Sequence, residues 1–116
     1  MTAFIRGLTA LITTGILLCS HFSVMASNSE LTIARQQQLI HMLKQDCGSC
    51  HGMSLKGGLG PTLLPNTMNK LPVAVIQHTI LFGRPGTAMP PWKSILTEQE
   101  ALWISQQLQQ GVENHD

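Results

Sequence analysis

The 116-residue chain has three cysteines, fewer than several common kinds of cysteine-dependent site require. One of them, Cys19, lies in an N-terminal segment that we expect to be removed. A closed structural zinc site takes four ligands, which Cys47 and Cys50 alone do not supply. A thioredoxin-like redox pair follows a strand in a βαβ setting, and no strand pattern leads into Cys47. Zinc, a redox-active pair and a structural disulfide are therefore the weaker interpretations of these two cysteines.

Charge is also scarce, because Asp, Glu, Lys and Arg together make up 11% of the chain. After residue 26 the positive and negative residues balance, six against six: Lys44, Lys56, Lys70, Lys93, Arg35 and Arg84 against Glu30, Asp46, Glu98, Glu100, Glu113 and Asp116. An even balance without a basic cluster argues against a nucleic-acid-binding protein. It also predicts that partners are not captured by strong long-range steering.

No apolar run approaches the roughly 20 residues that a spanning helix needs. The run from Leu8 to Leu18 is short and follows a positively charged residue, Arg6. It precedes a stretch that ends in a small residue, Ala26. This order is typical of a secretory signal peptide, which we place at residues 1–26, and it predicts a soluble periplasmic protein after cleavage. The alternatives are lipidation at Cys19, which the preceding leucine disfavours, and an uncleaved anchor. We expect contact with a membrane only during export.

The most informative stretch is Cys47-Gly48-Ser49-Cys50-His51, the Cys-x-x-Cys-His arrangement through which a c-type haem is attached. Each thiol can add across one haem vinyl group, and the two-residue gap places the sulfurs about one helical turn apart. His51 can then turn its imidazole onto the iron as the first axial ligand. The motif predicts one covalently attached haem c per chain, and this agrees with export.

A second axial ligand is expected from one of four methionines beyond residue 26: Met42, Met53, Met68 and Met89. Met42 fits packing, and Met53 is too close to His51 to cross the haem. Met68 would need an unusual loop. Met89 follows a predicted helix that can carry the chain around the ring, and neighbouring prolines stiffen its segment, as a weak thioether ligand requires. We predict Met89 as the sixth ligand, with Met68 as the alternative.

Three further residues are candidates for holding the haem. Four glycines between residues 52 and 60 predict a loop able to press against a haem face. Carbonyls near Pro61 could then hold the free ring nitrogen of His51, although a plain turn is the alternative. Arg84 and Trp92 flank Met89 with groups that can hydrogen-bond haem propionates, whereas simple surface placement would also explain them. His41 and His78 are expected on the surface, although His78 could in principle be an axial ligand.

The periodicity predicts an all-α, single-domain protein with three main helices wrapped around the haem. Thr32 caps a helix over 33–45, a second runs over 72–82, and Thr97 begins a capping box for a third ending near Gln110. A short helix is expected over 65–70. Residues 27–31 would be a flexible lead, 32–111 the domain and 112–116 a flexible tail. Ala101, Ile104 and Leu108 form the stripe predicted to pack on the first helix.

With these features, the chain resembles a class I cytochrome c over nearly all of its length after residue 26. The stretches 45–52, 57–61 and 83–92 are similar to the small cytochrome c55X proteins of denitrifying bacteria. That resemblance implies an electron carrier for the haem d1 nitrite reductase, or a helper in maturing haem d1. A different terminal reductase or oxidase is a further possible acceptor, and a quinol-oxidising complex or another cytochrome the upstream donor. A haem enzyme such as a peroxidase needs an open iron position, which Met89 would fill, so we expect no enzyme.

Overall fold

The structure, a computed structural model, describes residues 30–112, and in this range it contains helices and no strand. The elements are α1 (Ile33–Met42), the π-helix η1 (Leu43–Cys47), α2 (Gly48–His51), α3 (Pro65–Met68), α4 (Val73–Phe82) and α5 (Glu98–Gln110). The all-α class with three main helical segments is therefore confirmed. The predicted signal peptide, most of the lead and the end of the tail lie outside the described residues.

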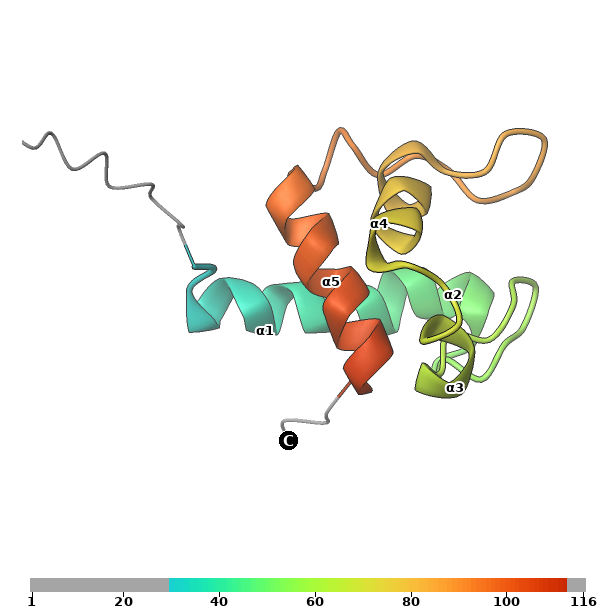
Figure 1. Cartoon of the computed structure of the whole chain (residues 1–116), viewed down its shortest axis with the longest axis horizontal. Coiled ribbons are helices and arrows are strands. Elements are labelled where there is room, and N and C mark those ends of the chain that lie inside the picture. The colour runs from blue at the N-terminus through green and yellow to red at the C-terminus, as the bar shows by residue number, and fades with distance from the viewer. Residues whose placement is uncertain (1–29, 113–116) are drawn as a thin grey trace, which may run out of the picture.

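Helices α1, η1 and α2 form one continuous helical segment (Figure 1). It begins as the sequence predicts, because the Thr32 side chain accepts a hydrogen bond from the Arg35 N–H. Its predicted end near Gln45 is wrong: the helix continues through His51. The N–H of Gly48 donates to the carbonyl of Leu43, five residues earlier, as in a π-helix. Such a wide turn shifts the register of the residues that follow it, here the cysteines and histidine of the motif.

The remaining helices begin and end close to their predicted limits. Helix α4 ends at Phe82 and is capped by Gly83, whose φ of 67° favours glycine. Pro72 is its N-cap residue and not, as predicted, its first helical residue. Helix α3 is two residues shorter than predicted. Helix α5 begins with the predicted capping box, in which Thr97 and Glu100 each bind the other's backbone N–H.

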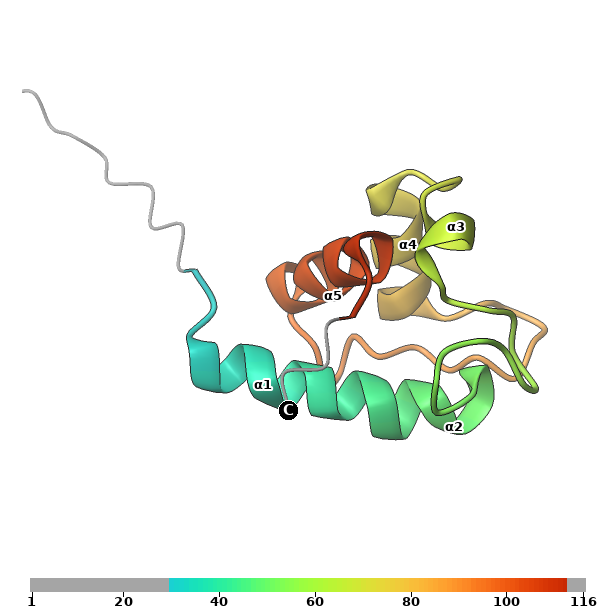
Figure 2. The ribbon, with the colours of Figure 1, turned by 90° about the horizontal axis from the view of Figure 1, so that it is seen from below.

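The core lies where α5 crosses the long helical segment and packs against α4 (Figures 1 and 2). Leu39, Leu43 and Ala101 are fully buried, and Ile104 and Leu108 continue the predicted stripe on α5. This helix contacts α1 as expected, but its contact with α4 is more extensive. Arg35 and Glu100 form an ion pair that also joins α1 to α5.

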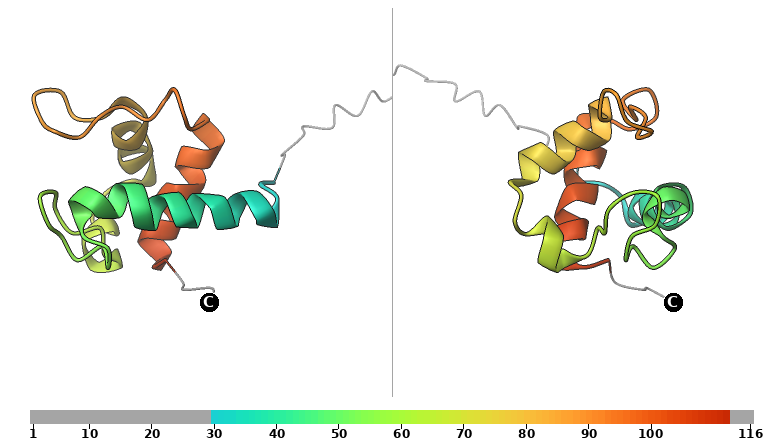
Figure 3. Two further views of the ribbon diagram at one scale, coloured as in Figure 1. Left: turned by 180° about the vertical axis from the view of Figure 1, so that it is seen from behind. Right: turned by 90° about the vertical axis from the view of Figure 1, so that its right-hand side faces the viewer.

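Two loops project from the same end of the molecule, at the right of Figure 1. One joins α2 to α3 and the other joins α4 to α5, and Figure 3 shows both from that end. They place the residues after His51 and the residues around Met89 beside the same region. Between residues 30 and 112, no helix is both long enough and apolar enough to cross a membrane.

Candidate haem-binding site

A cavity of about 590 Å³ lies between α2, α4 and the two loops. Its walls are mainly apolar, with Ile76 and Ile80 from α4 and Ile104 and Leu108 from α5. This volume and lining are typical of a site for a cofactor-sized apolar molecule. All of the sequence-predicted site residues line this one cavity: Cys47, Cys50, His51, Pro61, Arg84, Met89 and Trp92.

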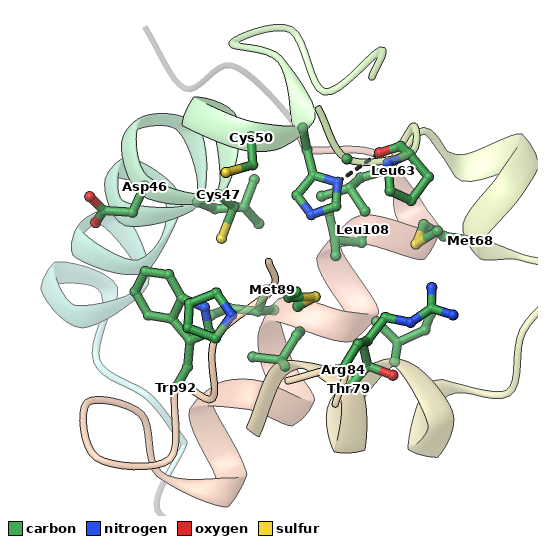
Figure 4. A pocket seen from close by; sticks show the side chains of 18 of the residues that line it. Asp46, Cys47, Cys50, Leu63, Met68, Thr79, Arg84, Met89, Trp92 and Leu108 are labelled. Atoms are coloured by element: carbon green, nitrogen blue, oxygen red, sulfur yellow. Dashed lines mark hydrogen bonds between the residues drawn. The ribbon is translucent and has the colours of Figure 1, made fainter. Parts of the chain in front are cut away.

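The two cysteines enter the cavity from the end of the long helix (Figure 4). Both are free thiols in the structure. Burial, and to a smaller extent the nearby carboxylate of Asp46, raises the pKa of the Cys47 thiol to about 11. A redox-active pair requires a thiol whose pKa is lowered instead. The electrostatics at Cys47 therefore do not fit thiol–disulfide exchange, whereas covalent attachment of a cofactor remains compatible with them.

His51 is buried beside these thiols, and its ring is held by the loop that follows it. Its Nδ1 lies 2.7 Å from the carbonyl oxygen of Pro61. Because a carbonyl only accepts, Nδ1 carries the proton and Nε2 keeps the lone pair that a metal ligand needs. A Cβ on Gly60 would lie 2.7 Å from Cε1 of the ring, so only glycine allows this close approach. The predicted contact between the free ring nitrogen of His51 and a carbonyl near Pro61 is thus present.

Short hydrogen bonds bind this loop to the helical motif itself. The N–H of Gly57 donates to the His51 carbonyl and that of Gly60 to the Cys50 carbonyl, each at 2.8 Å. The motif and the loop therefore form one local unit that fixes the imidazole.

Met89 enters the cavity from the loop between α4 and α5, on the side opposite the two cysteines (Figure 4). The loop is folded on itself: the N–H of Arg84 donates to the Met89 carbonyl at 3.2 Å, and that of Met89 to Oγ1 of Thr87 at 3.3 Å. The Trp92 N–H donates to the Ile80 carbonyl at 3.1 Å and thereby ties the end of the loop to α4. Arg84 and Trp92 flank Met89, as predicted from their positions in the sequence.

Met53, Met68, His41 and His78 occupy less suitable places. Met68 is buried and also lines the cavity, but it lies toward the edge beside Leu63, whereas Met89 lies at the middle (Figure 4). Met53 is 60% exposed and is not part of the lining. His41 and His78 are exposed, and His78 packs its ring against Phe82.

Sequence reasoning missed several lining residues. The cavity face of α4 contains Val75 and Thr79 beside Ile76 and Ile80, and the sequence analysis singled out none of these four residues. Leu59 and Leu71 also line the cavity from loops. Helical spacing from Ile76 and Ile80 could have indicated Thr79, but no sequence pattern marks the two loop leucines.

Comparison with known proteins agrees with this geometry. Residues 34–106 match the family described as cytochrome C oxidase, cbb3-type, subunit III. Over 75 residues the chain is 47% identical to the cytochrome c55X of Paracoccus denitrificans, covering 65% of this chain and 73% of that protein. The chain belongs to the cytochrome c55X family of c-type cytochromes. It is also 51% identical over 77 residues to the cytochrome c55X of Pseudomonas aeruginosa, with 66% of this chain matched. The match spans 65% of that relative, just under two thirds of its length.

Solved structures show the same relationship. A structure named c-type cytochrome NirC superposes with a TM-score of 0.69 at 46% identity, covering 71% of this chain and 96% of that one. A second, dihydro-heme d1 dehydrogenase NirN in complex with DHE, gives a TM-score of 0.58 at 34% identity, covering 66% of this chain but 16% of that one. As a c-type cytochrome, the c55X-family chain carries covalently bound haem c, and its cavity has the apolar walls and paired thiols that fit this group.

Proposed function

We propose that this cytochrome carries single electrons in the periplasm and delivers them to the haem d1 nitrite reductase. Cys47 and Cys50 would hold the haem through two thioether links, and His51 and Met89 would bind its iron. Bound haem c supplies a one-electron iron couple. The observation that supports this assignment is the convergence of an oriented imidazole, two thiols and a thioether on one apolar cavity of about 590 Å³.

The residues around the site have separate tasks in this proposal. The Pro61 carbonyl holds Nδ1 of His51, so the imidazole ring is already oriented before it binds the iron. The apolar walls exclude water, and Arg84 and Trp92 bind the propionates at the rim. Ligation by methionine and histidine gives a higher reduction potential than ligation by two histidines. Both axial positions are then filled, which suits a carrier rather than an enzyme.

The choice of acceptor rests on relatives rather than on geometry. The resemblance to cytochrome c55X proteins of denitrifying bacteria implies the haem d1 nitrite reductase, and a quinol-oxidising complex or another cytochrome would supply the electrons. One relative, named dihydro-heme d1 dehydrogenase, contains a similar segment. These relationships support the proposal that the electron transfer serves nitrite reduction.

Stopped-flow absorbance tests this acceptor. Reduced, haem-loaded protein is mixed with haem d1 nitrite reductase and nitrite, and reoxidation of the c-type haem is followed. Fast reoxidation, within a catalytic turnover of the reductase, is the expected result. Absent reoxidation by a reductase that is active with another donor would overturn the proposed acceptor.

A second candidate function is assistance in maturing haem d1. The observation that favours it is the 40% identity over 60 residues to the dihydro-heme d1 dehydrogenase of Pseudomonas aeruginosa, which spans 12% of that protein. Deletion of the gene separates the two functions. A reductase that lacks haem d1 after deletion indicates maturation, whereas a loaded reductase that is starved of electrons indicates donation.

A further inference from the structure

The Pro61 carbonyl orients His51, but little in Pro61 itself fixes the direction of this carbonyl. Pro61 is exposed, so burial does not hold it in place. As a proline it also has no N–H to donate. The position of the carbonyl oxygen, 2.7 Å from Nδ1 of His51, therefore depends on the residues on either side of the proline.

Hydrogen bonds anchor the chain on both sides of this proline. On one side, the N–H of Gly60 donates to the Cys50 carbonyl at 2.8 Å. On the other side, Oγ1 of Thr62 donates to the Leu55 carbonyl oxygen at 3.1 Å, and the N–H of Leu63 donates to the same oxygen at 2.9 Å. The first anchor ends on the haem-attachment motif. The second ends on a single carbonyl within the loop, so its strength depends on how the backbone of Leu55 is held.

Leu55 has an unusual backbone conformation for a leucine. Its φ is 57°, and among residues 30–112 it is the one non-glycine residue with a positive φ. This left-handed conformation costs an L-residue about 1 kcal/mol, and such strain persists only where surrounding contacts enforce it. Two contacts enforce it here, because the side chain is buried in the core and the N–H donates to the Gly52 carbonyl at 2.8 Å. Glycine would adopt this backbone freely but would remove the buried side chain.

The Thr62 hydroxyl links the strained residue to the helix that follows the loop. Its Oγ1 donates to the Leu55 carbonyl and accepts a hydrogen bond from the N–H of Leu64 at 3.3 Å. Leu64 is the N-cap residue of α3. Because a hydroxyl can donate and accept at the same time, one side chain holds the residue after Pro61 between the core and α3.

We propose that Thr62 and Leu55 are positioning residues for His51. They act through the Pro61 carbonyl, which they keep directed at the Nδ1 proton. The inference rests on the proposed ligation of iron by His51. A hydrogen bond from Nδ1 to a carbonyl makes a ligating imidazole more basic, and a more basic ligand lowers the reduction potential. The Thr62 hydroxyl thus sets part of the potential at which this cytochrome passes its electron.

Thr62→Val tests the hydroxyl, because valine has nearly the same shape but can neither donate nor accept a hydrogen bond. Thr62→Ser keeps the hydroxyl and is the conservative variant. Gln109→Met is the matched control, since Nε2 of Gln109 also donates to two backbone carbonyls, at 3.3 Å to Met68 and 2.8 Å to Leu71. Both acceptors line the cavity, but they lie in or after α3 and not in the loop that holds His51. All variants are studied as haem-loaded protein.

Two readouts follow His51 directly: exchange of its Nδ1 proton, measured by NMR of the reduced protein, and the reduction potential. In Thr62→Val the proton should exchange about fivefold faster, because one hydrogen bond that holds the loop is lost, and the potential should rise. Thr62→Ser should keep both at their wild-type values. Gln109→Met should lose stability and leave both unchanged. Unchanged readouts in Thr62→Val, or equal changes in Gln109→Met, would overturn the positioning role.

The unsubstituted protein supplies a second test, which holds even if Thr62→Val fails to fold. The Leu63 N–H shares the Leu55 carbonyl with Thr62, so its exchange reports whether this anchor is closed. Below the unfolding transition, the Leu63 proton and the Nδ1 proton of His51 should be lost through the same local opening. Loss of the Leu63 proton while the Nδ1 proton is retained would overturn the inference. His51 ring protons without paramagnetic shifts in the ferric protein would instead contradict the proposed ligation.

Discussion

The loop that follows His51 and the loop that carries Met89 border one cavity, but they are held in different ways. The first makes two backbone hydrogen bonds of 2.8 Å to the motif and a 2.7 Å bond to the imidazole. The second makes internal bonds of 3.2 and 3.3 Å at Met89, and residues 84–88 are exposed. Segments with few buried contacts open most easily. The imidazole is therefore the fixed ligand of the proposed pair, and the thioether the ligand that is easily lost.

The largest expected effect comes from Met89→Ala. If Met89 is the sixth ligand, this change abolishes the absorption signature of sulfur bound to ferric iron and allows the reduced protein to bind carbon monoxide. The matched variant Met68→Ala should keep the signature while losing about 2–5 kcal/mol of stability, because Met68 is buried. Optical spectra and carbon monoxide titration measure both. A signature that survives in Met89→Ala but disappears in Met68→Ala would reverse the ligand assignment.

Gly83→Ala tests how the Met89 loop is positioned without changing the ligand. A Cβ on Gly83 would lie 2.6 Å from the Met89 carbonyl oxygen and 2.7 Å from the carbonyl carbon of Pro90, and the residue has a φ of 67°. The clash and the left-handed backbone together should lower the free energy of unfolding by about 2–4 kcal/mol. The sulfur signature should weaken and be lost at lower temperature than in the wild type. A stable variant with an unaltered signature would show that the loop adapts freely.

Gly60→Ala makes the corresponding change on the histidine side. Its Cβ would meet the His51 ring at 2.7 Å, and the expected cost is about 1–3 kcal/mol of unfolding free energy. Gly86→Ala is the control in the Met89 loop. A Cβ added there would contact nothing within 4 Å beyond its chain neighbours, so only the φ of 77° is unfavourable, at about 1 kcal/mol of unfolding free energy. Denaturant unfolding of the haem-loaded variants measures the difference. Gly86→Ala proving the more destabilising would contradict the contrast between the loops.

These contrasts also show how far the sequence alone leads. The caps at Thr32 and Thr97 depend on neighbouring residues and were predictable. The π-helical turn from Leu43 to Cys47 was not, because it joins a residue packed in the core, Leu43, to a motif that faces the cavity. The site residues were predicted from a local motif and from the stiffness around Met89. Leu59 and Leu71 were missed because their place in the cavity wall depends on how distant loops meet.

Glu100→Gln is expected to have the smallest effect, because Glu100 lies in the first turn of α5 and does not line the cavity. The hydrogen bond from Arg35, helped by the Thr97 backbone and side chain, lowers the pKa of Glu100 below its ordinary value of 4.5. A lowered pKa stabilises the folded state above the unfolded-state pKa, and this contribution is lost as the pH falls through the folded-state value. The wild type should therefore unfold at higher denaturant than the variant at pH 7, and the difference should shrink below about pH 4.5. The sulfur signature at pH 7 should be the same in both proteins, since this ion pair joins α1 to α5 and Glu100 meets the α4–α5 loop only at its last residue, Thr97. A variant that loses the signature at neutral pH would show that this ion pair and the Met89 loop are coupled, and the two loops could then no longer be treated as locally held.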